Sequence, residues 1–292
     1  MKGFIKGACP AKARVHTKVD SCSMFEGKPH GLIFHDARVS YTPDEDIFND
    51  EIQAAITVEG AERITPIMQG ITDYQPTGGD VQTSQEGFGP DVPIGLNAKS
   101  VIFVINKGGL CLYKQLAKLN GQTLRVLEVD NTRRAYGTAF DQKGEERFRG
   151  FLCTVYVSRR NNTGSQEGAI LLNVYYSVDY EKEDNNVAAI PLAEDIEGLS
   201  GVLLKRVDVD KAKFVSACSD VDLTDTYNTS LEDVTIYQDK SGANPATVTY
   251  NAADKTLTFA PTGGSYRVAD AATLITANIE GYEGEDVYAN LS

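Results

Sequence analysis

The sequence has no tryptophan among its 292 residues, and it has few methionines and histidines. It also lacks an apolar run near the roughly 18 to 20 residues that a membrane-spanning helix needs. Its first residues, MKGFIKGACPAKARVHTK, lack the apolar core of a secretory signal. We therefore expect a protein that acts without a membrane and without export. Because 41% of the residues are hydrophobic, the chain is long and apolar enough for one large or two ordinary domains.

The three histidines, His16, His30 and His35, are the first places to look for metal or acid–base chemistry. Together with Cys9 and Cys22 they do not show the closely spaced cysteine pairs of a zinc finger. The sequence also has no GxSxG motif, no GK[ST] phosphate loop and no EF-hand order of acidic residues. We therefore expect no metal, no cofactor and no enzyme activity. A hydrolase that depends on one of these histidines stays open as an alternative, because catalytic partners need not be adjacent in sequence.

Cysteine is sparse and scattered along the chain: Cys9, Cys22, Cys111, Cys153 and Cys218. No two of these residues form a CxxC pair, and their number is odd, which argues against a disulfide framework. We expect reduced and mostly buried thiols, because free cysteine behaves as a small apolar residue.

The chain also lacks a basic balance. Its formal net charge is −13, whereas a general nucleic-acid binder needs a basic surface. Basic side chains outnumber acidic ones in residues 1–40, and acidic side chains dominate residues 220–292. Opposite charges at the two ends favour head-to-tail association of subunits. Two solvated surfaces that merely differ in charge are an equally good explanation.

The N-terminal part combines an arm, a strand and a helix. Residues 1–30 are rich in glycine and lysine with weak periodicity, which indicates an extended N-terminal arm. Residues 31–40 (GLIFHDARVS) are typical of a strand. A helix is expected over residues 43–55, where Thr42 and Glu45 can form a capping box ahead of apolar residues at helical spacing.

A polar stretch over residues 73–93 follows and is rich in proline and glycine. We expect a long loop there. Loops longer than about 12 to 15 residues within a compact domain are usually functional or disordered. In a protein that assembles from copies of itself, such a loop is a natural contact with the next subunit.

The stretch from Gly87 to Tyr180 has the clearest pattern, that of a β-rich unit with a single helix. β-Branched and aromatic residues predict its strands, whereas apolar residues at helical spacing before an Asn-Gly stop predict the helix. Strands are expected at 100–106, 123–130, 148–159 and 169–180, and the helix at 110–119. Asn161–Gly164 predicts the turn that joins the last two strands into a hairpin.

The C-terminal part has shorter strands. A strand at 202–208 is expected to close the first domain, which then spans residues 31–215. The polar and acidic residues 216–229 are expected to form a linker. Over residues 230–292, short segments such as TVTY and TLTF recur at the spacing of a small β-sandwich.

Several segments together resemble a known family: QTSQEGFGPDVPIGL, KSVIFVIN, LRVLEVDNTRRAYGTAF, RFRGFLCTVYVSRR and AILLNVYYSVDY. Over residues 60–210 their order is similar to that of virion structural proteins of tailed bacteriophages, in particular the tail-tube type. The later segment VTIYQDKSGANPATVTYNAADKTLTFAP resembles the immunoglobulin-like modules appended to phage surface proteins. The resemblance implies a mainly β (α+β) fold, with a tail-tube-like β-sandwich, one or two flanking helices and a small C-terminal immunoglobulin-like β-sandwich.

The resemblance also implies a function. Such proteins self-assemble into rings or a tube, a tail tube or neck ring, through which DNA passes without specific binding because an acidic lumen repels its backbone. The expected partners are copies of the chain and other virion proteins, with no membrane. The expected location is the virion, after synthesis in the host cell cytoplasm. Subunit contacts are assigned to the polar stretch at 73–93 and to the basic N-terminal arm at 1–30. The residues are Tyr74, Gln75, Gln82, Gln85, Glu86, Phe88, Lys12 and Arg14.

Two other structural functions stay open. A head decoration or neck protein could use the same two-domain layout, and it would bind capsid hexamers rather than stack on itself. A surface module could bind host glycans through the C-terminal β-sandwich, and glycan binding by that isolated domain would support this function.

Overall fold

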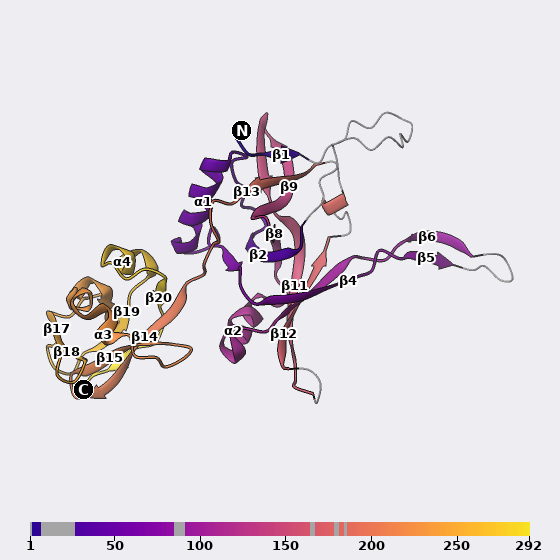
Figure 1. Cartoon of the computed structure of the whole chain (residues 1–292). Helices are drawn as coiled ribbons and strands as arrows, with labels where there is room; N and C mark the ends of the chain where they lie inside the picture. The colour runs from indigo at the N-terminus through magenta and orange to yellow at the C-terminus, as the bar shows by residue number, and fades with distance from the viewer. Residues whose placement is uncertain (1, 7–26, 85–90, 164–166, 178–180, 184–185) are drawn as a thin grey trace. The chain divides into compact units, whose positions relative to one another are not determined.

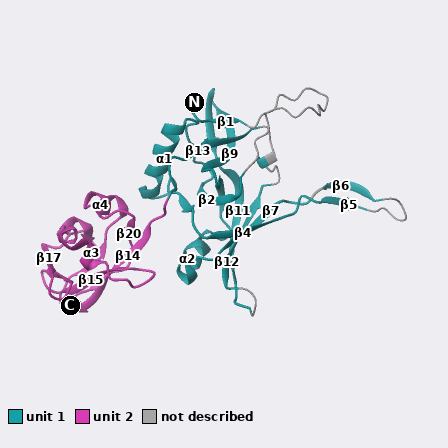
Figure 2. Cartoon of the chain, viewed as in Figure 1, with its two compact units in different colours: residues 1–196 teal, residues 197–292 magenta. Residues whose placement is uncertain are grey.

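The computed structural model describes residues 2–6, 27–84, 91–163, 167–177, 181–183 and 186–292. The fold is mainly β, with several sheets and few helices, as the sequence predicts (Figure 1). The chain divides into two compact units, residues 1–196 and 197–292, each with its own apolar core (Figure 2). Among the described residues, no helix is long and apolar enough to cross a membrane.

Unit 1 contains an 11-stranded sheet in which neighbouring strands are antiparallel. Its main path runs β1 (Ile5–Lys6), β13 (Val187–Pro191), β9 (Arg134–Gln142), β8 (Thr123–Asp130), β11 (Phe151–Arg160), β12 (Ala169–Tyr176), β7 (Ser100–Ile105) and β4 (Ile71–Thr77). Three strands join this path from the side: β2 (Pro29–Asp36) pairs with β8 and β3 (Thr65–Ile67), and β10 (Glu145–Arg149) pairs with β9. The strand β4 therefore forms one end of the path.

The core of unit 1 forms because alternate residues of these strands are apolar. In β11 one side chain in two is buried: Phe151, Cys153, Val155 and Val157. The residues between them are partly or fully exposed, as expected when successive side chains point to opposite faces of a sheet. The buried face packs with residues of β7 and β12, and with Leu116 of α2 (Gly109–Leu116).

Most predicted elements of this sheet are confirmed within a few residues. The strand expected at 123–130 is β8, and the helix expected at 110–119 is α2 followed by η1 (Ala117–Leu119). The strand expected at 148–159 is two strands, β10 and β11, that meet at Gly150. A Cβ at Gly150 would lie 2.5 Å from the backbone carbonyl carbon of Val126, so only glycine lets β8 approach this closely.

The first helix, α1, spans Glu45–Thr57 close to the predicted position. One of its faces is buried in unit 1: Phe48, Ile52, Ala55 and Ile56. The predicted capping box is wrong. Asp44, rather than Thr42, is the N-cap residue, and no side chain caps the helix. Thr42 instead donates its backbone N–H and its hydroxyl to the Glu51 carboxylate, at 2.7 and 2.8 Å.

The polar stretch at 73–93 is not a loop where the structure describes it, so that prediction is wrong. It contains most of β4, then β5 (Val81–Ser84) and the start of β6 (Val92–Leu96), and β5 pairs antiparallel with β6. A backbone hydrogen bond of 3.1 Å from Gly79 to Asn97 connects this pair to the β4–β7 pair. A two-stranded ribbon has free edges, so it tolerates the prolines that make the sequence resemble a loop.

Unit 2 combines a five-stranded and a three-stranded sheet with short helices. The larger sheet runs β17 (Thr247–Asn251), β18 (Thr256–Ala260), β15 (Lys211–Ser216), β14 (Ser200–Asp208) and β20 (Tyr282–Gly284). The smaller sheet runs β16 (Tyr237–Gln238), β19 (Ser265–Val268) and β21 (Ala289–Asn290), and the helices are α3 (Thr224–Tyr227), η3 (Asn228–Glu232), η4 (Val234–Ile236) and α4 (Ala271–Thr276). Because β14 and β20 are parallel, the unit departs from the antiparallel sheets of an immunoglobulin-like sandwich.

The boundary between the units lies earlier than the sequence predicts. The strand at 202–208 belongs to unit 2 instead of closing the first domain, and the expected linker 216–229 contains α3. The physical reason is the apolar core of unit 2, which joins Val202 and Leu204 to residues as late as Leu291. Residues 197–229 are therefore part of the second folded unit.

The cysteines are only partly as expected. Cys153 is buried and free, and burial raises the pKa of its thiol to about 12, which keeps it protonated at neutral pH. Cys111 and Cys218 each take part in a disulfide bond, so the expectation of reduced thiols is wrong for each of them. Cys9 and Cys22 lie outside the described residues.

Candidate assembly interface

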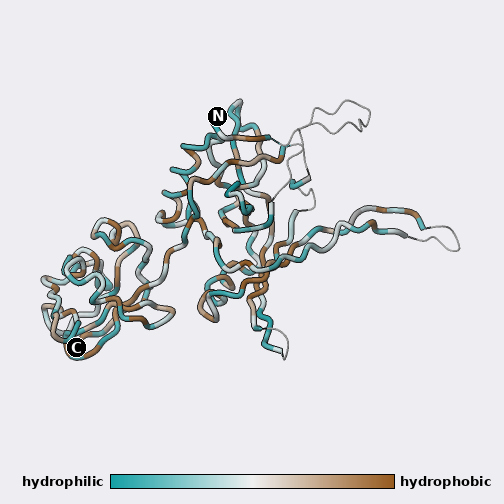
Figure 3. The backbone as a smooth tube through the Cα atoms, in the orientation of Figure 1, coloured by the Kyte–Doolittle hydropathy of each residue, from teal (hydrophilic) through white to brown (hydrophobic). Residues whose placement is uncertain are grey.

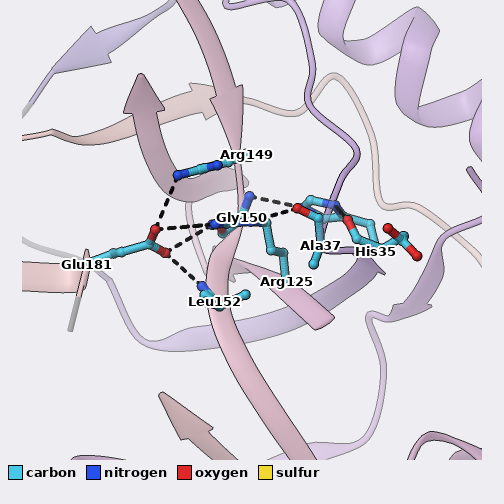
Figure 4. A network of polar contacts seen from close by, with 8 residues as sticks. His35, Ala37, Arg125, Arg149, Gly150, Leu152 and Glu181 are labelled. Atoms are coloured by element: carbon cyan, nitrogen blue, oxygen red, sulfur yellow. Dashed lines mark hydrogen bonds and ion pairs between the residues drawn. The ribbon is translucent and has the colours of Figure 1, made fainter. Parts of the chain in front are cut away.

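Two regions of unit 1 stand out as candidates for function: a buried polar network and an exposed ribbon. The network connects β2, β8, β10 and β11 to the short helix η2 (Glu181–Glu183) (Figure 4). Within the described part of the chain, no group of three or more His, Cys, Asp or Glu residues is arranged to hold a metal ion. The network must therefore be judged by its own contacts.

His35 is a buried member of this network. Its Nε2 accepts the backbone N–H of Gly150 at 3.0 Å, so Nδ1 carries the proton and donates to the Asp36 carbonyl oxygen at 3.0 Å. Burial lowers the pKa of His35 to about 4. His35 is therefore neutral at pH 7, and both of its nitrogens bond the backbone. Of the other two histidines, His30 has its Nε2 3.5 Å from Oδ1 of Asp195. His16 lies outside the described residues.

Arg125, which is buried, and Glu181, whose side chain is 18% exposed, form a largely buried ion pair beside His35, with 3.0 Å between Nη1 and Oε2. Arg125 also donates to the Gly150 carbonyl oxygen at 2.6 Å, and Glu181 accepts the backbone N–H of Leu152 at 2.8 Å. A buried ion pair whose remaining groups bond the backbone fixes the surrounding strands in place. We conclude that this network stabilises the fold, and we place the candidate site on the ribbon.

The ribbon continues the β4–β7 pair at one end of the sheet, and we call residues 78–84 and 91–97 the arm. Figure 1 shows it extending away from the rest of unit 1, and Figure 3 shows hydrophobic residues along β6. Three of its aliphatic side chains are mostly exposed, Val81 at 58%, Val92 at 53% and Ile94 at 64%. Ile94 is the most exposed large hydrophobic side chain among the described residues. The arm thus presents an apolar surface with no core behind it.

The base of the arm depends on glycine. Gly78 has a φ of +82°, a left-handed conformation that residues with a Cβ rarely adopt. A Cβ at this position would also collide with the carbonyl oxygen of Ala98, which lies between β6 and β7. Gly78 therefore helps to fix the direction in which the arm leaves the β4–β7 pair.

Three of the eight residues assigned to subunit contacts are described: two lie on β4, next to the arm, and one lies in the arm itself. Tyr74 and Gln75 are exposed on β4. Gln82 is exposed on β5, where its side-chain amide donates to the side-chain oxygen of Asn97. The remaining five lie outside the described residues: Gln85, Glu86, Phe88, Lys12 and Arg14.

Sequence reasoning missed the apolar side chains of the arm. Val81, Val92 and Ile94 were not assigned to a contact because the surrounding prolines and glycines indicated a polar loop. A usable signal was present, since two β-branched residues, Val92 and Ile94, within three positions are typical of a strand.

Comparison of the chain with protein-family models, curated proteins and solved structures finds no match. A functional assignment therefore depends on the geometry of the site and on the sequence itself.

Proposed function

We propose that the chain is a structural protein that assembles with copies of itself into a ring or tube, such as the tail tube or neck ring of a tailed bacteriophage. The observation that carries this proposal is the arm. A two-stranded ribbon alone is at best marginally stable in water, and this one exposes Val81, Val92 and Ile94. Burying each of these side chains against a neighbour would contribute on the order of 1 kcal/mol. The arm therefore gains stability when a partner covers it.

The end of the sheet supports a contact that repeats from copy to copy. In the described part of the chain, β4 pairs only with β7. Its other edge presents backbone groups that a strand of a neighbour can pair with. A contact between two different surfaces repeats head to tail, and it closes into a ring or continues as a filament.

Charge and sequence support the placement in a phage particle. A channel built from subunits with a net charge of −13 repels the DNA backbone, so DNA would pass without binding. The order of segments over residues 60–210 resembles tail-tube proteins. The proposed partners are copies of the chain and other virion proteins, and the proposed location is the virion.

Deleting residues 80–96 tests the proposal. The Gly79 N–H already bonds the Asn97 carbonyl oxygen at 3.1 Å, so these ends can be joined as a tight turn that keeps β4 and β7. We expect rings or tubes of the intact chain in negative-stain electron microscopy, and a folded monomer of the deletion variant in analytical ultracentrifugation. An intact chain that stays monomeric at high concentration would overturn self-assembly. Rings formed by the deletion variant would overturn the role of the arm.

A further inference from the structure

A cleft beside α1 combines an apolar wall with polar groups, and we call it the α1 cleft. Its volume is about 660 Å3, within the range of binding sites for ligands. The end of α1 lines one part of it with Ala54, Ala55 and Val58. Tyr41 and Arg147 of β10 also line the cleft. An occupant would thus meet both an apolar surface and hydrogen-bond donors.

Tyr41 supplies an unpartnered polar group. Its ring packs edge-on against His35 and Phe48, with ring centroids 5.2 and 5.5 Å apart, and only 3% of the residue is exposed. Its hydroxyl is buried without a hydrogen-bond partner among the described residues. A buried hydroxyl left without a partner costs about 1–3 kcal/mol. An acceptor brought into the cleft would recover part of that free energy.

Arg147 supplies an available positive charge. Its guanidinium donates to the Thr42 hydroxyl at 3.1 Å and to a backbone carbonyl oxygen at 2.8 Å, which are both neutral groups. It forms no ion pair with any described residue. Three carboxylates line the cleft, and none of them pairs with Arg147: Asp36 binds Arg38, Glu51 accepts from Thr42, and Glu62 forms no ion pair with a described residue. Arg147 is therefore free to pair with an incoming carboxylate.

The arm carries the complementary groups. Asp80 and Asp91 are its charged residues, and neither forms an ion pair within the described part of the chain. Ile94 is the extra residue at a β-bulge of β6, a feature that redirects a side chain. Figure 2 shows the arm and α1 on opposite sides of unit 1, so an arm does not cover the cleft of its own copy.

We propose that the α1 cleft of one copy receives the arm of a second copy. Val92 and Ile94 lie against the alanine-rich end of α1, a backbone carbonyl oxygen of the arm accepts the Tyr41 hydroxyl, and Asp91 pairs with Arg147. The inference rests on the proposed self-assembly and names its contact. Because each chain has one arm and one cleft, the same contact repeats along the whole assembly.

Cysteine crosslinking between two variants tests the contact directly. Ile94→Cys protein is mixed with Val58→Cys protein under mild oxidation, and we expect a crosslinked dimer that neither variant forms alone. Wild-type protein controls for the native cysteines, and Ser158→Cys, at an exposed position of β11, replaces Val58→Cys as the matched control. Assembly without this crosslink, or with equal crosslinking to Ser158→Cys, would overturn the contact and leave self-assembly standing. A wild-type chain that does not assemble at all would instead overturn the proposed function.

The substitution Tyr41→Phe gives a second test, because its effects on monomer stability and on assembly should have opposite signs. Removing an unpartnered hydroxyl should leave the thermal stability of the monomer unchanged or slightly higher. It should weaken assembly about five- to tenfold, because the arm loses a donor, and ultracentrifugation over a concentration series measures this. Tyr156→Phe, on the exposed face of β11, should leave assembly unchanged. Assembly of Tyr41→Phe equal to that of the wild type would overturn the role of the hydroxyl.

Discussion

The sheet formed by β8, β11, β12 and β7 and the arm formed by β5 and β6 use the same antiparallel pairing, but they bury different amounts of apolar surface. Phe103 and Leu172 pair across β7 and β12 and are buried in the core of unit 1. Val92 and Ile94 lie on a ribbon and are mostly exposed. Backbone pairing alone thus defines the arm, whereas side-chain packing stabilises the sheet. Under the proposed function, a second copy supplies the packing that the arm lacks.

The largest expected effect on the stability of a single copy is that of Phe103→Ala. Phe103 is 1% exposed and packs in the core of unit 1, so its truncation should lower the free energy of unfolding by about 3–5 kcal/mol. Val92→Ala in the arm is the matched substitution and should change it by less than about 0.5 kcal/mol. Chemical denaturation of both variants measures the contrast. Equal losses would show that the two regions are equally packed.

A smaller effect on the free energy of unfolding is expected from a change in pH. It arises from His35 in the sheet, and the arm does not contribute to it. Burial lowers the pKa of His35 from 6.5 to about 4, so the unfolded chain binds this proton more readily than the folded chain. The contribution of His35 to stability is therefore complete above pH 6.5 and is lost as the pH falls toward 4, by up to about 3 kcal/mol. Denaturation midpoints between pH 7 and pH 4.5 measure the loss.

The control for this pH dependence is His35→Gln, which keeps a donor and an acceptor but does not titrate. Its stability should fall less steeply over the same pH range. Parallel pH profiles of the two proteins would contradict the assignment of a buried neutral histidine to this position.

The substitution Gly78→Ala should have a modest effect on folding and a larger one on assembly. The new side chain is strained at a φ of +82° and collides with Ala98, which redirects the arm. We expect a loss of about 1–2 kcal/mol in the free energy of unfolding and a clear weakening of assembly. Gly144→Ala is a matched control, because Gly144 also has a positive φ but has open space around it. Similar assembly of both variants would show that the direction of the arm does not matter.

The same contrast explains what the sequence could predict. The sheet was predictable because its apolar residues alternate, as in β11, and because Asn120-Gly121 marks the end of a helix. The arm was not, because a ribbon without a core needs no alternation and tolerates proline, so its composition is that of a loop. The prediction of the domain boundary was wrong for a related reason. Val202 alternates with Leu204 in either domain, and only long-range packing decides which core they join.

The smallest effect on the stability of a single copy is expected from Ile94→Ser. This variant gives the sharpest test of the difference between the sheet and the arm. Ile94 is 64% exposed, so its replacement should leave the free energy of unfolding unchanged within about 0.5 kcal/mol. Leu110→Ser, at a similarly exposed position of α2, should do the same. Only Ile94→Ser should weaken assembly in ultracentrifugation, because only the arm buries its apolar surface between copies. Equal weakening by both variants would mean that exposed apolar area in general, rather than the arm, holds the copies together.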